Sequence, residues 1–370
     1  MILNKTHHKK MEQSNQKKGK VYVINPCGDG WTVGECVRAA GQLMTRFQRD
    51  YFEASGYEII NMHGTECKDP PIAYLNHIDK WVHEPIVAKN LLERIEKQMS
   101  EEYDSHAIVW FHEMFGLWTC MKDRKIQILK EKYPKRIHLI GWQDDLHAKF
   151  DWKMILSVLD ALLCPYDIQY MKEQVARYIP NDVIHKVYTF YYFVPSFRIQ
   201  DNDDTEQEWK KRKSQKVLLT GRIHGRVYPL REKYSNNKNV HTYTHHKILE
   251  TGEHKNNEYF EVLKDYQSSI ATSAKNMYYC LAKYLEIAAM QTFMICELHP
   301  QLKDMGFIDG VHYVGLNDKN VENAAIKQDD ESFRKRYNIA KNAIQVIREK
   351  HTDTARAKDL VSFFDQHFLF

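Results

Sequence analysis

The sequence predicts an α/β protein of two domains, on three observations. The chain has 370 residues, a length that suits two domains of ordinary size. Short apolar runs rich in β-branched residues alternate with helical segments along most of the chain, which is typical of parallel sheets covered by helices on both faces. Residues 196–215 are strongly charged and separate two such series, so we expect an exposed linker or loop between the domains there.

The first series follows a lysine-rich N-terminus. Residues 1–19 are polar and lack the apolar centre of a signal peptide, so we expect a disordered basic leader. Residues 20–195 are expected to form the N-terminal domain. Its predicted strands are 21–24, 57–60, 107–111, 138–142, one within 155–164, and the aromatic run 187–193 near the domain crossing.

The second series is expected to form a C-terminal domain over residues 216–370. A strand at 216–220 leads into Gly221 and a helix that starts near Tyr228. The other predicted strands are 239–243, 292–296 and 312–315, and the predicted helices are 259–266, 278–290, 332–349 and 355–367.

Charge and cysteine content argue against several classes of protein. The formal net charge of +4 is too small to indicate nucleic-acid binding by itself. The seven cysteines are odd in number and include no Cys-x-x-Cys pair, and several lie in apolar runs. We therefore expect buried free thiols in a reducing, cytoplasmic compartment, not a disulfide framework or a zinc site. No apolar stretch reaches the roughly 18 residues of a membrane-spanning helix.

An ordered set of four motifs narrows the function. Val217-Leu-Leu-Thr-Gly-Arg222 combines a strand with a glycine turn, and Tyr228-Pro-Leu-Arg231 starts the helix after it. Lys283-Tyr-Leu-Glu286 lies in a helix that runs into a buried strand. His351-Thr-Asp-Thr-Ala-Arg-Ala357 opens the final helix. This order resembles the donor domain of GT-B glycosyltransferases, especially the group that is similar to CgeB and to glycosyl transferase family 1.

The resemblance covers residues 216–360 and has one departure, because Gln291 or its neighbour Met290 stands where that group has a glycine. It implies the GT-B fold, in which two Rossmann-like domains face a cleft and the last helix often returns to the first domain. It also implies a hexosyl- or pentosyltransferase that moves a sugar from a nucleotide diphosphate donor to a glycan, a protein or another acceptor. No cofactor and no bound metal are expected.

The resemblance also implies roles for two acidic residues. In the related enzymes a glutamate at the position of Glu286, three residues after Lys283, binds the donor ribose. One carboxylate can accept hydrogen bonds from both vicinal ribose hydroxyls. Many members carry a second glutamate eight residues earlier, where this chain has Tyr278. Glu297, after the buried strand, is a candidate substitute close to the sugar, or else a solvent-facing strand end.

Arginine side chains near the glycine turn are candidates for the donor diphosphate. Negative charge grows on this leaving group, and arginine, lysine and backbone N–H groups at a helix start stabilise it. We expect Gly221 to allow close approach of the backbone and Arg222 to be the main phosphate ligand, assisted by Arg226 or Arg231. For Arg231 an ion pair on the helix surface is an equal alternative.

Catalytic candidates in the N-terminal half follow predicted strands. Asp144, Asp145 and His147 come after strand 138–142, at the end of a parallel strand where α/β proteins bind ligands, and are candidates for the general base or for acceptor binding. His112-Glu113 is a second such pair, and for all of these an ordinary loop position is the alternative. The loop with Gly28, Asp29 and Gly30 does not have dinucleotide-binding spacing and is expected to lie beside the cleft.

Three other functions stay open on the sequence alone. A sugar-nucleotide epimerase and a non-catalytic binding protein could share this fold, because fold does not decide function. A transferase acting on DNA is disfavoured by the weak net charge.

Overall fold

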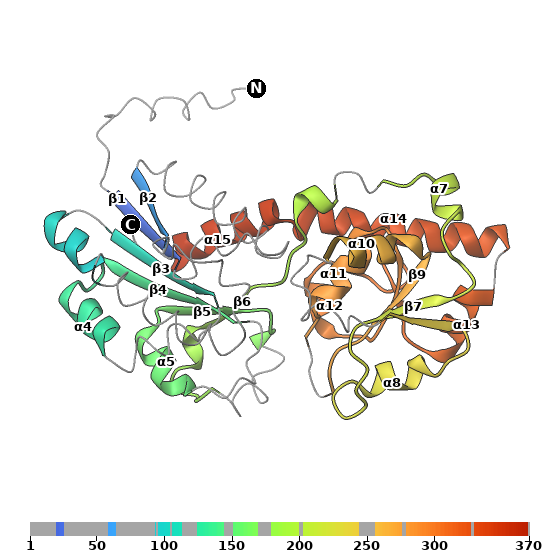
Figure 1. Ribbon diagram of the computed structural model, residues 1–370, viewed down its shortest axis with the longest axis horizontal. Helices are drawn as coiled ribbons and strands as arrows, with labels where there is room; N and C mark the ends of the chain where they lie inside the picture. Colours follow the sequence, from blue (N-terminus) through green and yellow to red (C-terminus); the bar gives the residue numbers. More distant parts are fainter. Residues whose placement is uncertain are drawn as a thin grey trace, which may run out of the picture.

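The computed structural model consists of two lobes, each built on a parallel β-sheet (Figure 1). The structure describes residues 20–25, 58–63, 93, 95–103, 106–112, 124–143, 151–168, 179–199, 203–243, 256–275, 279–326 and 329–368.

The first lobe contains a six-stranded sheet with the order β2-β1-β3-β4-β5-β6, in which every pair is parallel. Strands β4 and β5 are buried along their whole length, as expected for a sheet covered on both faces. The strands are β1 Lys20–Asn25, β2 Glu58–His63, β3 His106–His112, β4 Ile137–Trp142, β5 Ala161–Cys164 and β6 Val187–Thr189, with helices α4 Lys125–Lys132 and α5 Trp152–Val158 between them. The predicted strands are thus confirmed, although the aromatic run 187–193 is a strand only through Thr189.

The second lobe contains a five-stranded parallel sheet with the order β11-β10-β9-β7-β8. Its strands are β7 Val217–Thr220, β8 Val240–Tyr243, β9 Ser268–Ala271, β10 Phe293–Cys296 and β11 Val314–Gly315. Its helices are α7 Glu206–Lys210, α8 Pro229–Ser235, α10 Asn256–Asp265, α11 Ala282–Ala289, α12 Pro300–Asp304, α13 Asp318–Ile326 and α14 Asp330–Lys350. The central strand β9 was not predicted from the sequence.

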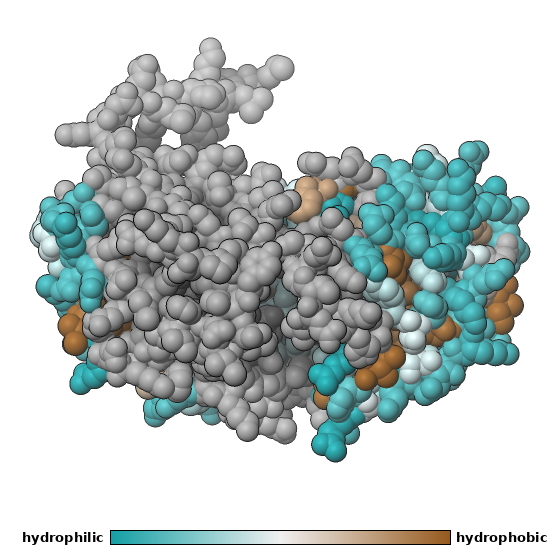
Figure 2. All heavy atoms as spheres, viewed as in Figure 1, coloured by the Kyte–Doolittle hydropathy of each residue, from teal (hydrophilic) through white to brown (hydrophobic). Residues whose placement is uncertain are grey.

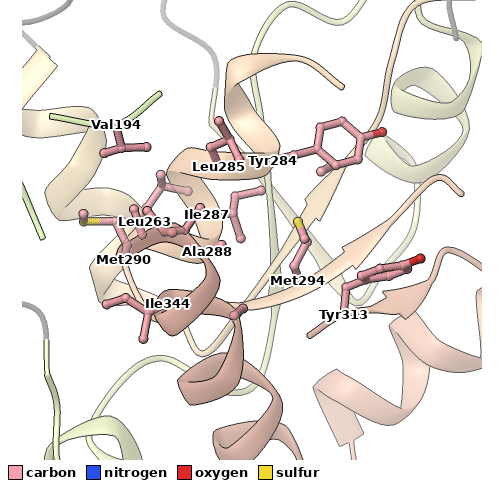
Figure 3. Close-up of a cluster of buried hydrophobic side chains, with 14 of the residues drawn as sticks. Val194, Leu263, Tyr284, Leu285, Ile287, Ala288, Met290, Met294, Tyr313 and Ile344 are labelled. Atoms are coloured by element: carbon pink, nitrogen blue, oxygen red, sulfur yellow. The ribbon is translucent and has the colours of Figure 1, made fainter. Parts of the chain in front are cut away.

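Helix α11 is the centre of the second lobe's core (Figure 3). Leu285, Ile287 and Ala288 on this helix are buried against Met294 of β10 and Ile344 of α14. The helix therefore packs between the sheet and α14, and this packing fixes the first turn of α11 at the edge of the sheet. On the face of the second lobe shown in Figure 2, hydrophilic residues predominate and apolar residues form small separate patches.

The charged segment 196–215 was predicted to be an exposed linker or loop. Most of residues 203–215 are exposed, but Glu206–Lys210 form helix α7 and two side chains are buried. Thr205 caps helix α7 with a capping box, and Trp209 of this helix is fully buried and donates its indole N–H to the Gln291 carbonyl at 2.7 Å. Arg212 is also buried, donates to the Met290 carbonyl, and pairs with Asp204 at 2.8 Å. The alternating charges of this segment gave no sign that Trp209 and Arg212 pack onto the second lobe.

The chain crosses between the lobes twice, and the two crossings are bonded to each other. Val194 donates its backbone N–H to the His351 carbonyl at 2.8 Å. The carboxylate of Asp353 is fully buried and accepts the Ser196 backbone N–H at 2.7 Å and the Ser196 hydroxyl. The terminal motif that begins at His351 thus joins the outward crossing to the return crossing.

Helix α15 Asp353–His367 returns to the first lobe, as the resemblance implied (Figure 1). Its residues Leu360 and Phe364 pack with Ile108 of β3 and Leu163 of β5 in one buried cluster. Within the described part of the chain, no helix combines the length and the apolar character that crossing a membrane requires.

Candidate active site

The carboxyl edges of the two sheets face each other. The ring of Tyr166, just after β5, stacks on the ring of Tyr279, which lies beyond the end of β9, at a centroid distance of 4.2 Å. Gln301 of α12 donates its side-chain N–H to the Pro165 carbonyl at 2.8 Å. Ligands of open α/β sheets bind outside the carboxyl ends of the strands, and in this protein the two edges of that kind meet at one place.

In the second sheet the direction of strand addition reverses between β7 and β9, which makes their carboxyl ends a topological switch point. Gly221 follows β7 with a φ of 96°, a backbone conformation that favours glycine. A Cβ at this position would lie 2.5 Å from the Nζ of Lys283 and 3.2 Å from a guanidinium nitrogen of Arg231. Two cationic groups therefore lie against the bare backbone of this glycine.

Arg231, in the first turn of α8, is held at the switch point by the end of β9. Its Nε donates to the Thr272 hydroxyl at 3.1 Å, and a terminal nitrogen donates to the Thr272 carbonyl at 3.2 Å. The guanidinium also stacks on the Tyr228 ring at 3.8 Å. Only 4% of the residue is exposed, so the predicted alternative of a surface ion pair is wrong.

Lys283, in the first turn of α11, donates its ammonium group to the Thr220 carbonyl at the end of β7. Burial, together with the positive charge of Arg231, lowers the pKa of Lys283 to about 7. Among the described residues, no carboxylate lies within ion-pair distance of Lys283 or Arg231. Glu286 opposes the charge of Lys283 only from beyond ion-pair distance, so two partly desolvated cations with no described carboxylate in contact form a site suited to an anion.

Two carboxylates flank this cation pair. Glu286 is one turn after Lys283 and accepts the Tyr259 hydroxyl at 3.1 Å, and burial raises its pKa. Glu297, after β10, accepts the Ser273 backbone N–H at 3.0 Å, and burial raises its pKa as well. The side chain of Glu297 is 32% exposed, which leaves part of it open to a ligand.

Ser273 and His299 were not predicted from the sequence. The Ser273 hydroxyl donates to the Tyr279 carbonyl at 2.8 Å, so it accepts from the Nε2 of His299, which lies 2.9 Å away. Burial lowers the pKa of His299 to about 4, so its imidazole is neutral at physiological pH. The position of His299 two residues after Glu297, at a strand end, was the one available signal.

The structure brings together five of the predicted donor-site residues, namely Gly221, Arg231, Lys283, Glu286 and Glu297. Arg222 and Arg226 are exposed on the loop between β7 and α8, and the Arg222 carbonyl accepts from Arg231 at 3.4 Å. The catalytic and cleft-loop candidates Asp144, Asp145, His147, Gly28, Asp29 and Gly30 lie outside the described residues, as do Glu113, Tyr278 and the His112 side chain.

Gln291, which replaces the glycine of the resembling group, lies at the far end of α11 from Lys283. It adopts a φ of 50°, and its side-chain amide exchanges two hydrogen bonds with the Asp204 backbone, at 2.9 and 3.0 Å. The replacement of this glycine by Gln291 therefore affects how the segment before β7 is attached, and it lies away from Arg231 and Lys283. The described residues contain no group of three or more histidine, cysteine, aspartate or glutamate side chains that could hold a metal ion.

Two parallel α/β domains with facing carboxyl edges and a last helix that returns to the first domain make up the GT-B fold, and solved structures agree. Sucrose-phosphate synthase from Thermosynechococcus elongatus is similar with a TM-score of 0.55 at 12% identity, over 94% of this chain and 98% of that chain. For trehalose-6-phosphate synthase the TM-score is 0.53 at 9% identity, over 94% and 99%. For Anabaena HepE in complex with UDP and glucose it is 0.51 at 8% identity, over 94% and 99%. No protein-family model and no curated protein matches the sequence. At these identities the likeness establishes the fold.

Proposed function

We propose that this protein is a glycosyltransferase that moves a sugar from a nucleoside diphosphate donor to an acceptor. The observation that carries the proposal is the Arg231–Lys283 cation pair, which lies at the switch point beside Gly221 without a carboxylate ion partner. The GT-B fold supports the same class, and the similar HepE structure contains UDP and glucose. The fold and the cation pair are independent arguments for one donor chemistry.

In the proposed reaction Arg231 and Lys283 bind the diphosphate. Charge on this leaving group increases as the glycosidic bond breaks, so both contacts strengthen in the transition state and raise kcat. A bound phosphate also favours the charged form of Lys283 and raises its pKa. Arg222 and Arg226, on the exposed loop nearby, assist from the outer side of the site.

The two carboxylates bind hydroxyl groups of the donor. We assign Glu286 to the donor ribose. A ribose hydroxyl either replaces the Tyr259 hydroxyl as the donor to this carboxylate or donates to it alongside that hydroxyl. We assign Glu297 to the transferred sugar, because the Ser273 N–H occupies one of its oxygens and leaves the other for a hydroxyl. Ser273 and His299 are positioning residues for this carboxylate.

The acceptor is proposed to bind on the side of the N-terminal domain, over residues 20–195. Asp144, Asp145 and His147 follow β4, whose sheet faces the donor domain at its carboxyl edge, and one of them is proposed to deprotonate the acceptor hydroxyl. The loop with Gly28, Asp29 and Gly30 follows β1 in the sequence and is proposed to contribute to the same side of the cleft. We propose a glycan or protein acceptor, a hexosyl or pentosyl donor and a reaction without metal or cofactor. The buried free thiols Cys164, Cys280 and Cys296 support a cytoplasmic location.

The test is a thermal-shift and calorimetric titration with UDP, GDP, ADP, CDP and TDP, since a ligand that binds the folded state raises the melting temperature. One of them should bind the wild-type protein, and Lys283→Met should weaken that binding. Lys335→Met, an exposed lysine on α14, is the matched control and should bind normally. If no nucleoside diphosphate binds, or if Lys283→Met binds equally well, the proposal is wrong.

Donor turnover separates this function from the alternatives on the same fold. A transferase releases the nucleoside diphosphate slowly by itself and faster with an acceptor. An epimerase interconverts donor sugars without an acceptor, and a non-catalytic protein does neither.

A further inference from the structure

A second polar groove lies at the domain crossing, outside the donor site. It has a volume of about 270 Å³ and is lined by residues of both crossings and of the second lobe. Tyr191 belongs to the outward crossing, Asp304 ends α12, Glu349 and Lys350 end α14, and Arg356 and Lys358 belong to α15. Because α15 packs on the first lobe, an occupant of this crossing groove would contact both lobes.

Four charged side chains of the crossing groove, two acidic and two basic, form no ion pair with one another. Within the described residues, no hydrogen bond or ion pair joins the side chains of Asp304, Glu349, Lys350 or Lys358 to another residue. The two carboxylates can only accept hydrogen bonds and the two ammonium groups can only donate them. The groove therefore offers unused acceptors and unused donors in equal number.

Arg356 adds a buried donor to the same groove. Its side chain is 8% exposed, and its terminal nitrogens donate to the Asp359 carboxylate and to the Nδ1 of His351. The Nε2 of His351 lies 2.7 Å from the Met305 carbonyl and must carry the ring proton, so Nδ1 is the acceptor. The Nε of Arg356 is buried without a partner, and an unsatisfied buried donor favours a ligand that supplies an acceptor.

We propose that the crossing groove binds a neutral saccharide unit. A simple anion would satisfy Lys350 and Lys358 but would meet the unpaired carboxylates of Asp304 and Glu349, and a simple cation has the opposite problem. A hydroxyl group donates and accepts at once, so vicinal hydroxyls can satisfy a carboxylate and an ammonium group together. The volume is just below the roughly 300 Å³ at which pockets for drug-sized ligands begin, which suits a single sugar ring.

The test measures saccharide binding to the full chain by saturation-transfer NMR and calorimetry, with glucose, galactose, N-acetylglucosamine and maltose as probes and inorganic phosphate as the anion. At least one saccharide should bind the wild-type protein. The double variant Asp304→Ala with Lys358→Ala should weaken that binding roughly tenfold or more. Both residues are exposed, and circular dichroism and melting temperature should show that the variant folds.

A matched double variant, Glu331→Ala with Lys335→Ala, removes the same two charges from an exposed face of α14 and should bind the saccharide normally. The donor-site variant Glu286→Ala should also retain saccharide binding, which keeps this result separate from the fate of the proposed function. The inference is overturned if no probe saccharide binds, if the Asp304 and Lys358 double variant loses phosphate binding in place of saccharide binding, or if that double variant binds the saccharide as tightly as the wild type.

Discussion

The ammonium group of Lys283 lies against Gly221, 2.5 Å from the point where any other residue would carry its Cβ. This contact joins the first turn of α11 to the end of β7, and it brings the positive charge to the reversal point of the sheet. The glycine is required twice there, for its φ of 96° and for the space that Lys283 occupies.

Gly221→Ala should therefore lower both stability and donor affinity. We expect a loss of about 1–2 kcal/mol in the free energy of unfolding from the positive φ alone, and a further loss as Lys283 is displaced. Gly310→Ala is the matched control, because Gly310 has a φ of 76° and a Cβ there would meet nothing within 4 Å. Urea unfolding and titration with the nucleoside diphosphate measure both effects. If Gly221→Ala and Gly310→Ala lose the same stability and bind the nucleoside diphosphate equally well, the contact between Gly221 and Lys283 has no role.

Donor affinity should fall as the pH rises through the pKa of Lys283, which is about 7 in the free protein. A bound diphosphate raises this pKa, so at higher pH the protein must take up a proton in order to bind. Below the pKa the lysine is already charged and its contribution is constant. Calorimetric Kd values between about pH 6.5 and pH 9 should show this slope for the wild type, and Lys283→Met should abolish it.

The stability of the free protein should respond to pH in the opposite sense. The pKa of Lys283 is lowered on folding from 10.5, so between these values the unfolded chain binds more protons. Stability from this group therefore rises as the pH increases from about 7 towards 10.5. Comparing wild type with Lys283→Met in urea unfolding at several pH values isolates this contribution, and parallel curves would contradict it.

Glu286→Ala should weaken donor binding by about 1–3 kcal/mol, because the ribose hydroxyls lose their acceptor. Tyr259→Phe is the informative partner variant, since it removes the hydroxyl that now occupies Glu286 and leaves the carboxylate intact. We expect its donor affinity to equal or exceed that of the wild type. Unchanged affinity in a folded Glu286→Ala protein would show that the ribose assignment is wrong.

The two arginines should respond differently to substitution. Arg222 is exposed, so Arg222→Ala should keep the wild-type melting temperature and lower kcat, with partial recovery in Arg222→Lys. Arg231 is buried and forked on Thr272, so Arg231→Lys should lower kcat by roughly tenfold or more and the melting temperature as well. Normal turnover of Arg222→Ala would show that Arg222 does not contribute and that Arg231 and Lys283 alone bind the diphosphate.

Local patterns were sufficient for most of the fold. Apolar β-branched runs such as Val217–Thr220 identified strands, and amphipathic repeats identified long helices such as α14, because burial on a sheet or a helix face imposes a fixed sequence period. Strand β9 was not predicted because the serines Ser268 and Ser269 are more typical of loops than of buried strands. In the structure the Ser269 hydroxyl donates to the Leu218 carbonyl at 3.1 Å, so its hydrogen-bonding need is met inside the sheet.

Local patterns predicted the residue types of the candidate donor site and their order, since Gly221, Arg231, Lys283 and Glu286 each follow a strand or helix start that can be recognised in the sequence. Only the packed fold shows which arginine is buried, that Lys283 contacts Gly221, and that Ser273 is bonded to both Glu297 and His299. Strand order and helix packing set the distances between residues that are remote in the chain. A local pattern contains no information on those distances or on the burial that shifts each pKa.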